Sequence, residues 1–271
     1  YSDRIRNNNG LDLNYRNDKW NFFGNFYGGF NNMKNTIDLK RKFEDGTLFE
    51  ETGENRSKNN YGGGKIGADY RLHKNHVVGV MARYGFWDWD GGNQLINTDI
   101  FKNDVKYQNE KTPSAPTEEG YDVNANLNYR WDIDSTSNLT VDVDYVRYKY
   151  DSKTDMNTDY DPYQTPYITH TSQNSKTNIY SFKADYENSL TEKTKLSAGL
   201  KFSKVDISSG SFFREQDANG NWSDTRGMTN DYDYKENVNA AYLSVHHKFT
   251  PDFDVQLGLR TEQTIMKGYN I

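Results

Sequence analysis

Polar and apolar residues alternate along much of the chain, and the stretch from Asn178 to Val205 shows this on both arms of a hairpin. From Tyr180 to Tyr186 the even positions are apolar or aromatic, while Ser, Lys and Asp occupy the odd positions between them. The same alternation returns from Leu196 to Phe202. A period of two predicts strands with one apolar and one polar face. The short polar link from Asn188 to Thr194 predicts that the two strands pair as an antiparallel hairpin.

Four further hairpins follow the same plan. Counting the hairpin at residues 178–205, the five short polar turns are centred near residues 18, 75, 135, 191 and 251, and they recur every 56 to 60 residues. Each arm is about ten residues long, and a tilted strand needs roughly 9–11 residues to cross a bilayer. The pattern therefore predicts about ten antiparallel strands, and their apolar faces could meet either a protein core or lipid.

Long polar segments separate the hairpins, at residues 41–60, 88–119, 151–176 and 207–236. Glu44, Asp45 and Gly46 predict the tip of an extended hairpin in the first segment. Residues 88–119 are expected to be irregular. Short turns at one end of the strands and long loops at the other are typical of an outer-membrane barrel, whose loops face the outside of the cell.

The composition favours lipid over a protein core. Apolar residues form 34% of the chain, or about 42% with glycine included, against roughly 45–50% in soluble domains. Aromatic residues nevertheless reach 15%, with 21 Tyr and 14 Phe, which is too many for a disordered chain. A transmembrane β-barrel reconciles the two observations, because only alternate strand residues face lipid and aromatic girdles mark its interfaces.

Other classes of protein are excluded by what the sequence lacks. No run approaches 18 apolar residues, so no transmembrane helix is predicted, and there is no cysteine for a disulfide framework. The net charge of -6 and the absence of a basic cluster argue against nucleic-acid binding. The chain starts at Tyr1 without Met, and we expect residues 1–271 to be part of a longer protein.

The two faces of the predicted wall carry different side chains. Girdle aromatics are expected at both ends of the membrane-spanning strands. Those near the short turns are Trp20, Tyr70, Tyr129, Trp131 and Tyr186, and those nearer the loops are Tyr84, Phe86, Tyr145 and Tyr180. The opposite face would line the lumen with both signs of charge, which suits a lumen filled by a plug better than an open ion pore. These residues are Asp122, Asn124, Asn126, Asn128, Arg130, Asp142, Asp144, Lys183, Asp185, Lys195, Arg260 and Glu262.

Two strand segments that each follow a short turn carry a family resemblance. Leu196 to Phe202 (LSAGLKF) and Val255 to Glu262 (VQLGLRTE) resemble barrel strands of TonB-dependent outer-membrane receptors, in particular the outer-membrane β-barrel family abundant in Bacteroidota. The resemblance implies a 22-stranded barrel preceded by a plug and an N-terminal domain. It also implies transport energised by the TonB complex, and in the related glycan importers a lipoprotein lid. Neither the plug nor the N-terminal domain can be matched in this chain.

Candidate ligand contacts lie in the polar segments. Trp89 and Asp90, within a Trp-Asp-Trp-Asp-Gly-Gly run from residue 87, could stack on a sugar or aromatic ligand and accept its hydroxyl groups. The alternative is a girdle aromatic that runs into a turn. Tyr160, Tyr163 and Trp222 are further candidate ligand contacts in the segments that follow.

No catalytic, metal or cofactor residue is expected. Asp217 to Asp224 carries oxygen donors at alternate positions, but Gly220 is fourth where a calcium loop requires glycine at the sixth position, which favours an Asn-Gly hairpin tip. His170 with Asp159 or Asp161 could supply part of the site of a ten-stranded outer-membrane protease. The sequence contains no nucleophile elbow, His-Glu-x-x-His motif or phosphate-binding loop.

The function expected from these observations is import of a scarce nutrient across the outer membrane of a Gram-negative bacterium, through a plugged barrel energised by TonB. Its expected partners are outer-membrane lipid, the TonB complex and a surface lipoprotein lid, with no nucleic acid among them. The alternative is a complete ten-stranded barrel that acts as a protease or an adhesin. A soluble β protein would need its apolar faces to pack on one another.

Overall fold

The computed structural model describes residues 5–162, 165–225 and 227–270 and contains twelve strands in that part of the chain. No helix among the described residues is long and apolar enough to cross a membrane. The strands are β1 (Arg6–Arg16), β2 (Trp20–Lys42), β3 (Thr47–His73), β4 (His76–Asp90), β5 (Gln94–Lys102), β6 (Val105–Asp132), β7 (Ser137–Asp161), β8 (Tyr167–Thr191), β9 (Thr194–Gln216), β10 (Trp222–Asp224), β11 (Asn230–Thr250) and β12 (Phe253–Asn270).

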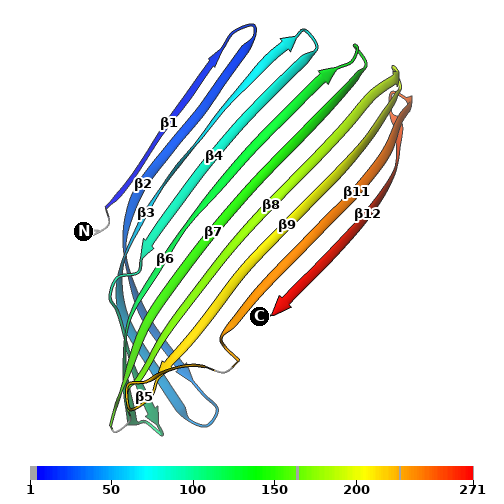
Figure 1. The fold of residues 1–271 in the computed structure, drawn as a ribbon. Coiled ribbons are helices and arrows are strands. Elements are labelled where there is room, and N and C mark those ends of the chain that lie inside the picture. The colour runs from blue at the N-terminus through cyan, green and yellow to red at the C-terminus, as the bar shows by residue number, and fades with distance from the viewer. Residues whose placement is uncertain (1–4, 163–164, 226, 271) are drawn as a thin grey trace.

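All strands belong to one antiparallel sheet. Ten of them form a wall in the order β1-β2-β3-β4-β6-β7-β8-β9-β11-β12, while β5 pairs with β3 and β6, and β10 pairs with β9. Figure 1 shows the ten strands side by side in a curved wall, with short turns at one end. The all-β, up-and-down architecture and the ten wall strands confirm the sequence prediction, whereas β5 and β10 were not predicted.

The five short turns lie where the sequence placed them, and polar side chains form hydrogen bonds within several of them. Asn17 Oδ1 accepts hydrogen bonds from the backbone N–H groups of Lys19 and Trp20, at 2.9 and 2.8 Å. Asp134 Oδ1 accepts from the backbone N–H groups of Thr136 and Ser137, at 2.7 and 2.8 Å. Side chains that bond to their own turn in this way replace water at N–H groups that have no strand partner.

Asp134 makes the turn between β6 and β7 sensitive to acid. Hydrogen bonds from Thr136 and Ser137 lower the pKa of Asp134 from 3.8 to about 2. Because the folded pKa is depressed, this stabilisation is present above pH 3.8 and is lost as the pH falls through about 2. We expect the carboxyl carbon of Asp134 to titrate near pH 2 in an NMR experiment on the folded protein. A midpoint at or above 3.8 would show that the turn does not hold the carboxylate.

In the described residues, strands make up most of the segments beyond the predicted arms, which corrects the expectation of irregular structure at residues 88–119. This segment contains the end of β4, all of β5 and the start of β6. Strand β6 has 28 residues, although roughly 9–11 suffice to span a bilayer. Outside a membrane both faces of a strand meet water, so the alternation that marks the spanning part disappears. The predicted hairpin tip at Asp45 and Gly46 is confirmed, because β2 ends at Lys42 and β3 begins at Thr47.

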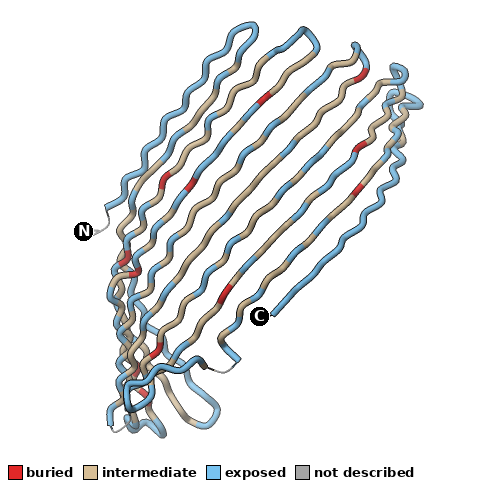
Figure 2. Tube along the Cα trace, viewed as in Figure 1, coloured by how far each residue is buried: buried red, intermediate tan, exposed pale blue. Residues whose placement is uncertain are grey.

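The wall has almost no buried apolar core. In the described residues Ile100 and Ala240 are the buried hydrophobic side chains, and large apolar side chains such as Leu127 and Val80 are about half exposed, at 49% and 51%. Figure 2 shows few buried positions along the whole trace. A single sheet with this exposure does not pack its apolar faces on one another, as a soluble β protein would.

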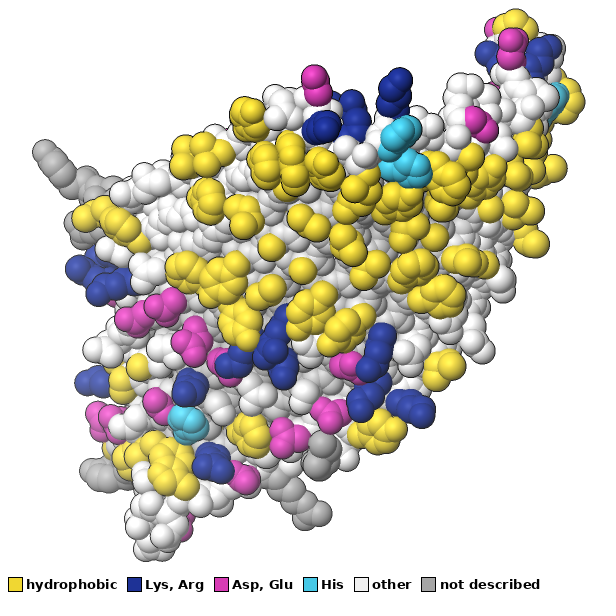
Figure 3. All heavy atoms as spheres, turned by 45° about the horizontal axis from the view of Figure 1, so that its top comes forward, with side chains coloured by type: hydrophobic (Ala, Val, Ile, Leu, Met, Phe, Trp, Pro, Cys, Tyr) yellow, Lys and Arg dark blue, Asp and Glu magenta, His cyan; other side chains and the backbone are white. Residues whose placement is uncertain are grey.

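The strand register places the apolar side chains on one face. Leu127 lies opposite Val80 on β4 and Val143 on β7, and Phe182 lies opposite Val143 and Phe202. We call this side of the sheet the apolar face and the other side the polar face. Figure 3 shows the hydrophobic side chains as a broad band across the molecule, with charged side chains beyond its borders.

Aromatic side chains lie at both margins of the band on the apolar face. Near the short turns the rings of Trp20 and Tyr70 have centroids 4.3 Å apart. Toward the other end of the strands, the rings of Tyr145 and Tyr180 are 5.1 Å apart. The register puts all nine predicted girdle aromatics on this face.

Candidate functional site

The polar face carries every residue that the sequence assigned to the lumen. Asn126 on β6 lies opposite Asp144 on β7, and Asp142 lies opposite Lys183 on β8. Because successive strand residues point to opposite faces, the same register places the other members of the predicted set on this face. The face therefore forms one continuous polar surface along the wall.

Several opposite charges on the polar face form ion pairs. Arg83 Nη1 lies 2.7 Å from Asp122 Oδ2. The Lys183 Nζ lies 2.5 Å from Asp185 Oδ2, and the Tyr242 hydroxyl donates to the other oxygen of Asp185 at 2.6 Å. A wall of paired charges presents hydrogen-bonding groups to a neighbour without a strong field of one sign, which is unlike the rings of one charge that select ions in a pore.

Aromatic rings on the polar face lie directly against glycines of the neighbouring strands. A Cβ added to Gly67 would be 2.2 Å from Cζ of Phe23, and one added to Gly120 would be 2.1 Å from Cζ2 of Trp87. The Trp87 ring also stacks on Tyr148, with centroids 5.3 Å apart. Because glycine has no Cβ, these rings occupy the space where a side chain would otherwise lie, so aromatic rings cover part of the backbone of the polar face. Tyr148 is not among the predicted lumen residues, although its even position on β7 places it on the polar face.

The structure places the tryptophans and the aspartates of the Trp-Asp-Trp-Asp run on opposite faces of the sheet. On β4 the odd residues Trp87 and Trp89 lie on the polar face, while Asp88 and Asp90 lie on the apolar side of the same strand. The rings and the carboxylates therefore point in opposite directions and cannot hold one sugar together. The girdle interpretation is also wrong for Trp87 and Trp89, because neither ring is on the apolar face. Asp90 Oδ1 instead accepts the backbone N–H of Gly92 at 2.8 Å.

Tyr160 lies on the polar face far beyond the apolar band, directly opposite Glu110. Burial raises the pKa of Glu110, and the nearby Glu51 carboxylate raises it further. Burial and the charge of Glu110 also raise the pKa of the Tyr160 hydroxyl. Gln108 donates a hydrogen bond of 2.9 Å to Glu110. This half-buried group offers a phenol, an amide and a carboxyl to a ligand at the outer end of the wall.

Trp222 lies elsewhere, on the short strand β10, and is 47% exposed. It lines a groove of about 310 Å³ together with Pro113, Met156, Ile168 and Asp155. The structure therefore does not bring Trp222 together with Trp89 or Tyr160. Tyr163, the remaining predicted ligand contact, lies outside the described residues.

His170 is paired, but with a partner that the sequence did not suggest. Its Nδ1 lies 2.6 Å from Asp155 Oδ1, so the predicted partners Asp159 and Asp161 are wrong. The two residues are direct cross-strand neighbours on the apolar side of β7 and β8. This pair therefore points away from the polar face.

The segment from Asp217 forms the predicted hairpin tip. Gly220 has a φ of +83°, and Asp217 Oδ1 accepts the backbone N–H groups of Asn219 and Asn221 at 2.9 and 2.8 Å. These hydrogen bonds lower the pKa of Asp217. Within residues 5–162, 165–225 and 227–270, no group of three or more His, Asp or Glu side chains is arranged to hold a metal ion.

The family of this chain follows from its second half. The model of the outer membrane protein beta-barrel family matches residues 131–271. The chain belongs to this family. The apolar band of this outer-membrane barrel protein is thus its lipid-facing surface, its polar face is the lumen side of the wall, and its location is the bacterial outer membrane.

Solved structures resemble this barrel protein at low sequence identity. The ferric citrate transporter FecA matches with a TM-score of 0.51 and 11% identity, over 98% of this chain and 38% of FecA. The monoaromatic hydrocarbon channel CymD matches with a TM-score of 0.34 and 9% identity, over 98% and 85% of the two chains. The outer membrane protease OmpT from Escherichia coli has a TM-score of 0.24 and 12% identity, over 83% and 86%. No curated protein sequence matches the chain.

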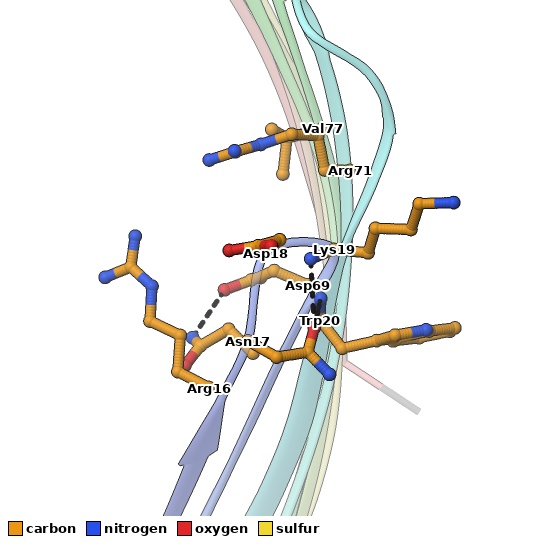
Figure 4. Close-up of a pocket in the computed structure, with 9 residues that line it drawn as sticks. Arg16, Asn17, Asp18, Lys19, Trp20, Asp69, Arg71 and Val77 are labelled. Carbon is orange, nitrogen blue, oxygen red and sulfur yellow. Dashed lines mark hydrogen bonds between the residues drawn. The ribbon is translucent and has the colours of Figure 1, made fainter.

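At the short-turn end of the wall, which in this family faces the periplasm, the barrel protein has a small charged pocket of about 190 Å³. Figure 4 shows Arg16, Asp69 and Arg71 on one side of the sheet, with Lys19 and Trp20 directed to the other side. Asn21 Nδ2 donates to Asp69 Oδ2 at 2.9 Å. The lumen side therefore keeps its mixture of both charge signs down to the periplasmic rim.

Proposed function

We propose that this chain is part of the wall of a wide, plugged barrel that imports a scarce nutrient with energy from the TonB complex, as in receptors of the Bacteroidota type. The observation that carries the proposal is the lumen side. Oppositely charged side chains on this side form ion pairs within the wall, as Arg83 and Asp122 do. Aromatic rings such as that of Phe23 lie against the backbone at glycines. A surface of this kind suits a protein plug that forms hydrogen bonds along the wall.

The edges of the sheet support a barrel wider than ten strands. Within the described residues, β1 pairs with β2 alone and β12 pairs with β11 alone. Backbone groups left unpaired in hydrocarbon cost several kcal/mol each, so a membrane sheet must close. We propose that residues 1–271 are a partial barrel domain closed by further strands of the same protein. The chain spans 38% of the length of FecA, whose likeness supports the fold alone.

Ligand capture is assigned to the parts of the strands beyond the lipid-facing band. Trp89 and Tyr160 face the lumen side there, whereas Asp90 and Trp222 lie on the outer surface. Tyr163 is the fifth candidate ligand contact that the sequence suggested. The polar rim formed by Tyr160, Glu110 and Gln108 would contact a ligand first on the lumen side. In this proposal a surface lipoprotein is the lid, the TonB complex acts on the plug, and no enzymatic step or cofactor is involved.

Electrical recording on the full-length protein tests the plug. We expect the protein in a planar lipid bilayer to be closed at first, because a plug fills the lumen. Urea at a concentration that leaves the barrel folded should then release the plug and produce large, stable conductance steps. A steady conductance before urea would contradict a plugged barrel. A membrane that stays silent after urea would contradict a wide barrel and favour a closed ten-stranded one, whose lumen side chains fill.

A binding experiment tests the energising partner separately. We expect the purified periplasmic domain of TonB to bind the full-length protein, and to bind more tightly when extracts that contain the nutrient are present. A plugged barrel to which TonB does not bind under either condition would contradict energised import and leave the barrel assignment intact.

A further inference from the structure

We propose that a basic cluster on the outer surface of the wall binds the phosphorylated headgroup of a lipid in the outer leaflet. The cluster consists of Arg147, Lys149, Lys176 and Lys204, which lie on β7, β8 and β9 directly beyond the lipid-facing band. It faces away from the lumen, so it is independent of the proposed import. The observation that leads to it is the abrupt change on these strands from apolar to basic side chains.

The register makes the cluster compact. Lys149 lies directly opposite Lys176, and Arg147 is two residues nearer the band on the same face of β7. Lys204 lies opposite Tyr180 on the neighbouring strand pair. Like charges directly opposite each other destabilise a sheet. An anion that binds between the two lysines removes this repulsion.

The protein does not neutralise the cluster by itself. Two carboxylates contribute, since Lys149 Nζ lies 2.6 Å from Asp151 and Lys204 Nζ lies 2.9 Å from Asp206. Among the described residues no ion pair involves the exposed side chain of Lys176, and the buried Nε of Arg147 has no hydrogen-bond partner. Two positive charges, those of Lys176 and of the Arg147 guanidinium, therefore remain for an external group. Arg and Lys are the side chains that bind phosphate oxygens in proteins.

The position of the cluster identifies the external group as a lipid headgroup. On β7 the outward side chains change from Val143 and Tyr145 to Arg147 and Lys149, and on β8 from Phe182 and Tyr180 to Asn178 and Lys176. The Tyr145–Tyr180 pair marks the membrane interface, where such rings lie at headgroup level. Figure 3 shows lysine and arginine side chains along the border of the hydrophobic band, with acidic side chains among them.

The neighbouring strands limit the site to one part of the wall. Asp88, Glu119 and Asp151 lie opposite one another across β4, β6 and β7 on the same outward side. This acidic row repels a phosphate group. The headgroup is therefore expected over β7, β8 and β9, with Lys176 at the centre, and not over β4 and β6.

A lipid titration tests the proposal. The full-length protein in uncharged detergent micelles is titrated with diphosphorylated lipid A that carries a fluorescent acyl chain, and binding is followed by polarisation. The variant Lys149→Gln/Lys176→Gln removes the opposed pair. Each basic residue near an anionic surface contributes about a fivefold gain in affinity, so the double variant should bind about 25-fold more weakly. Lys176→Gln alone, which breaks no ion pair, should bind about fivefold more weakly and serves if the double variant does not fold.

The matched control removes the same charge from the opposite side of the wall. Lys195→Gln/Lys201→Gln changes two lumen-side lysines of β9, and binding of lipid A should be unchanged in this variant. Equal weakening in both double variants would overturn the proposal, because it would reflect net charge. Equal binding of dephosphorylated lipid A, or full competition by millimolar inorganic pyrophosphate, would also overturn it.

Discussion

Leu127→Arg should destabilise the folded barrel in lipid by about 2–4 kcal/mol, because an arginine on the lipid side at mid-bilayer loses its hydration. Leu127 lies near the middle of the band, between Val80 and Val143 on the neighbouring strands, and is 49% exposed in the wall itself. Its exposed half is the part that meets lipid. The measurement is equilibrium folding of the full-length protein into phosphatidylcholine vesicles over a urea gradient.

Asn126→Arg is the control for this prediction, because residue 126 precedes Leu127 on β6 and faces the lumen. Its new charge would lie beside Asp144, to which Asn126 now donates a hydrogen bond of 2.7 Å. We expect a smaller loss than for Leu127→Arg, because the new charge meets a carboxylate on the polar face and not hydrocarbon. A larger loss for Asn126→Arg than for Leu127→Arg would show that the two faces are assigned the wrong way round.

Gly67→Ala should destabilise the wall by about 1–3 kcal/mol, because one added methyl group overpacks a filled site. All three atoms nearest to the added Cβ belong to the ring of Phe23, at 2.2, 2.5 and 3.0 Å. Phe23 lies directly opposite Gly67 in the sheet, so the ring cannot move away without leaving the backbone surface that it covers. The same urea titration measures the loss.

Two further variants decide whether the ring is the cause. Gly258→Ala on β12 adds the same methyl group where the nearest atoms are 3.7 and 3.8 Å away, and we expect it to be neutral. In a protein that already carries Phe23→Leu, adding Gly67→Ala should cost much less stability than it does in the wild type. This double-mutant cycle isolates the contact between the two residues. Additive losses would mean that Gly67 is needed for its backbone and not for the ring.

The sequence predicted well those features that depend on one strand and its own turn. Alternation placed Leu127 and Asn126 on opposite faces, and turn chemistry placed Asp134 and Asn17 at the short-turn end. These features are local, because a period of two and a hydrogen bond to the next backbone N–H involve only neighbouring residues. The lumen-side charges were predicted for the same reason.

The structure does not bring the candidate ligand contacts together. Trp89 and Asp90 are adjacent in sequence, and the strand geometry separates them onto opposite sides of the wall. Trp222 belongs to a strand of three residues that pairs only with β9 in the described part of the chain, which no periodicity could reveal. Beyond the membrane the alternation fades because water meets both faces, and with it the signal that distinguishes strand from loop.

The sequence by itself determined that this chain forms hairpins of membrane-spanning length with one lipid-facing side. Every second residue of such a strand faces hydrocarbon and is therefore apolar, while the residues between face the lumen and are polar. The tertiary structure alone decided which side chains meet across strands. The stacking of Trp87 on Tyr148, the fit of Phe23 on Gly67 and the opposition of Lys149 to Lys176 all depend on the register between strands. That register is fixed when backbone hydrogen bonds form between segments distant in the sequence, so it leaves no trace in either segment alone.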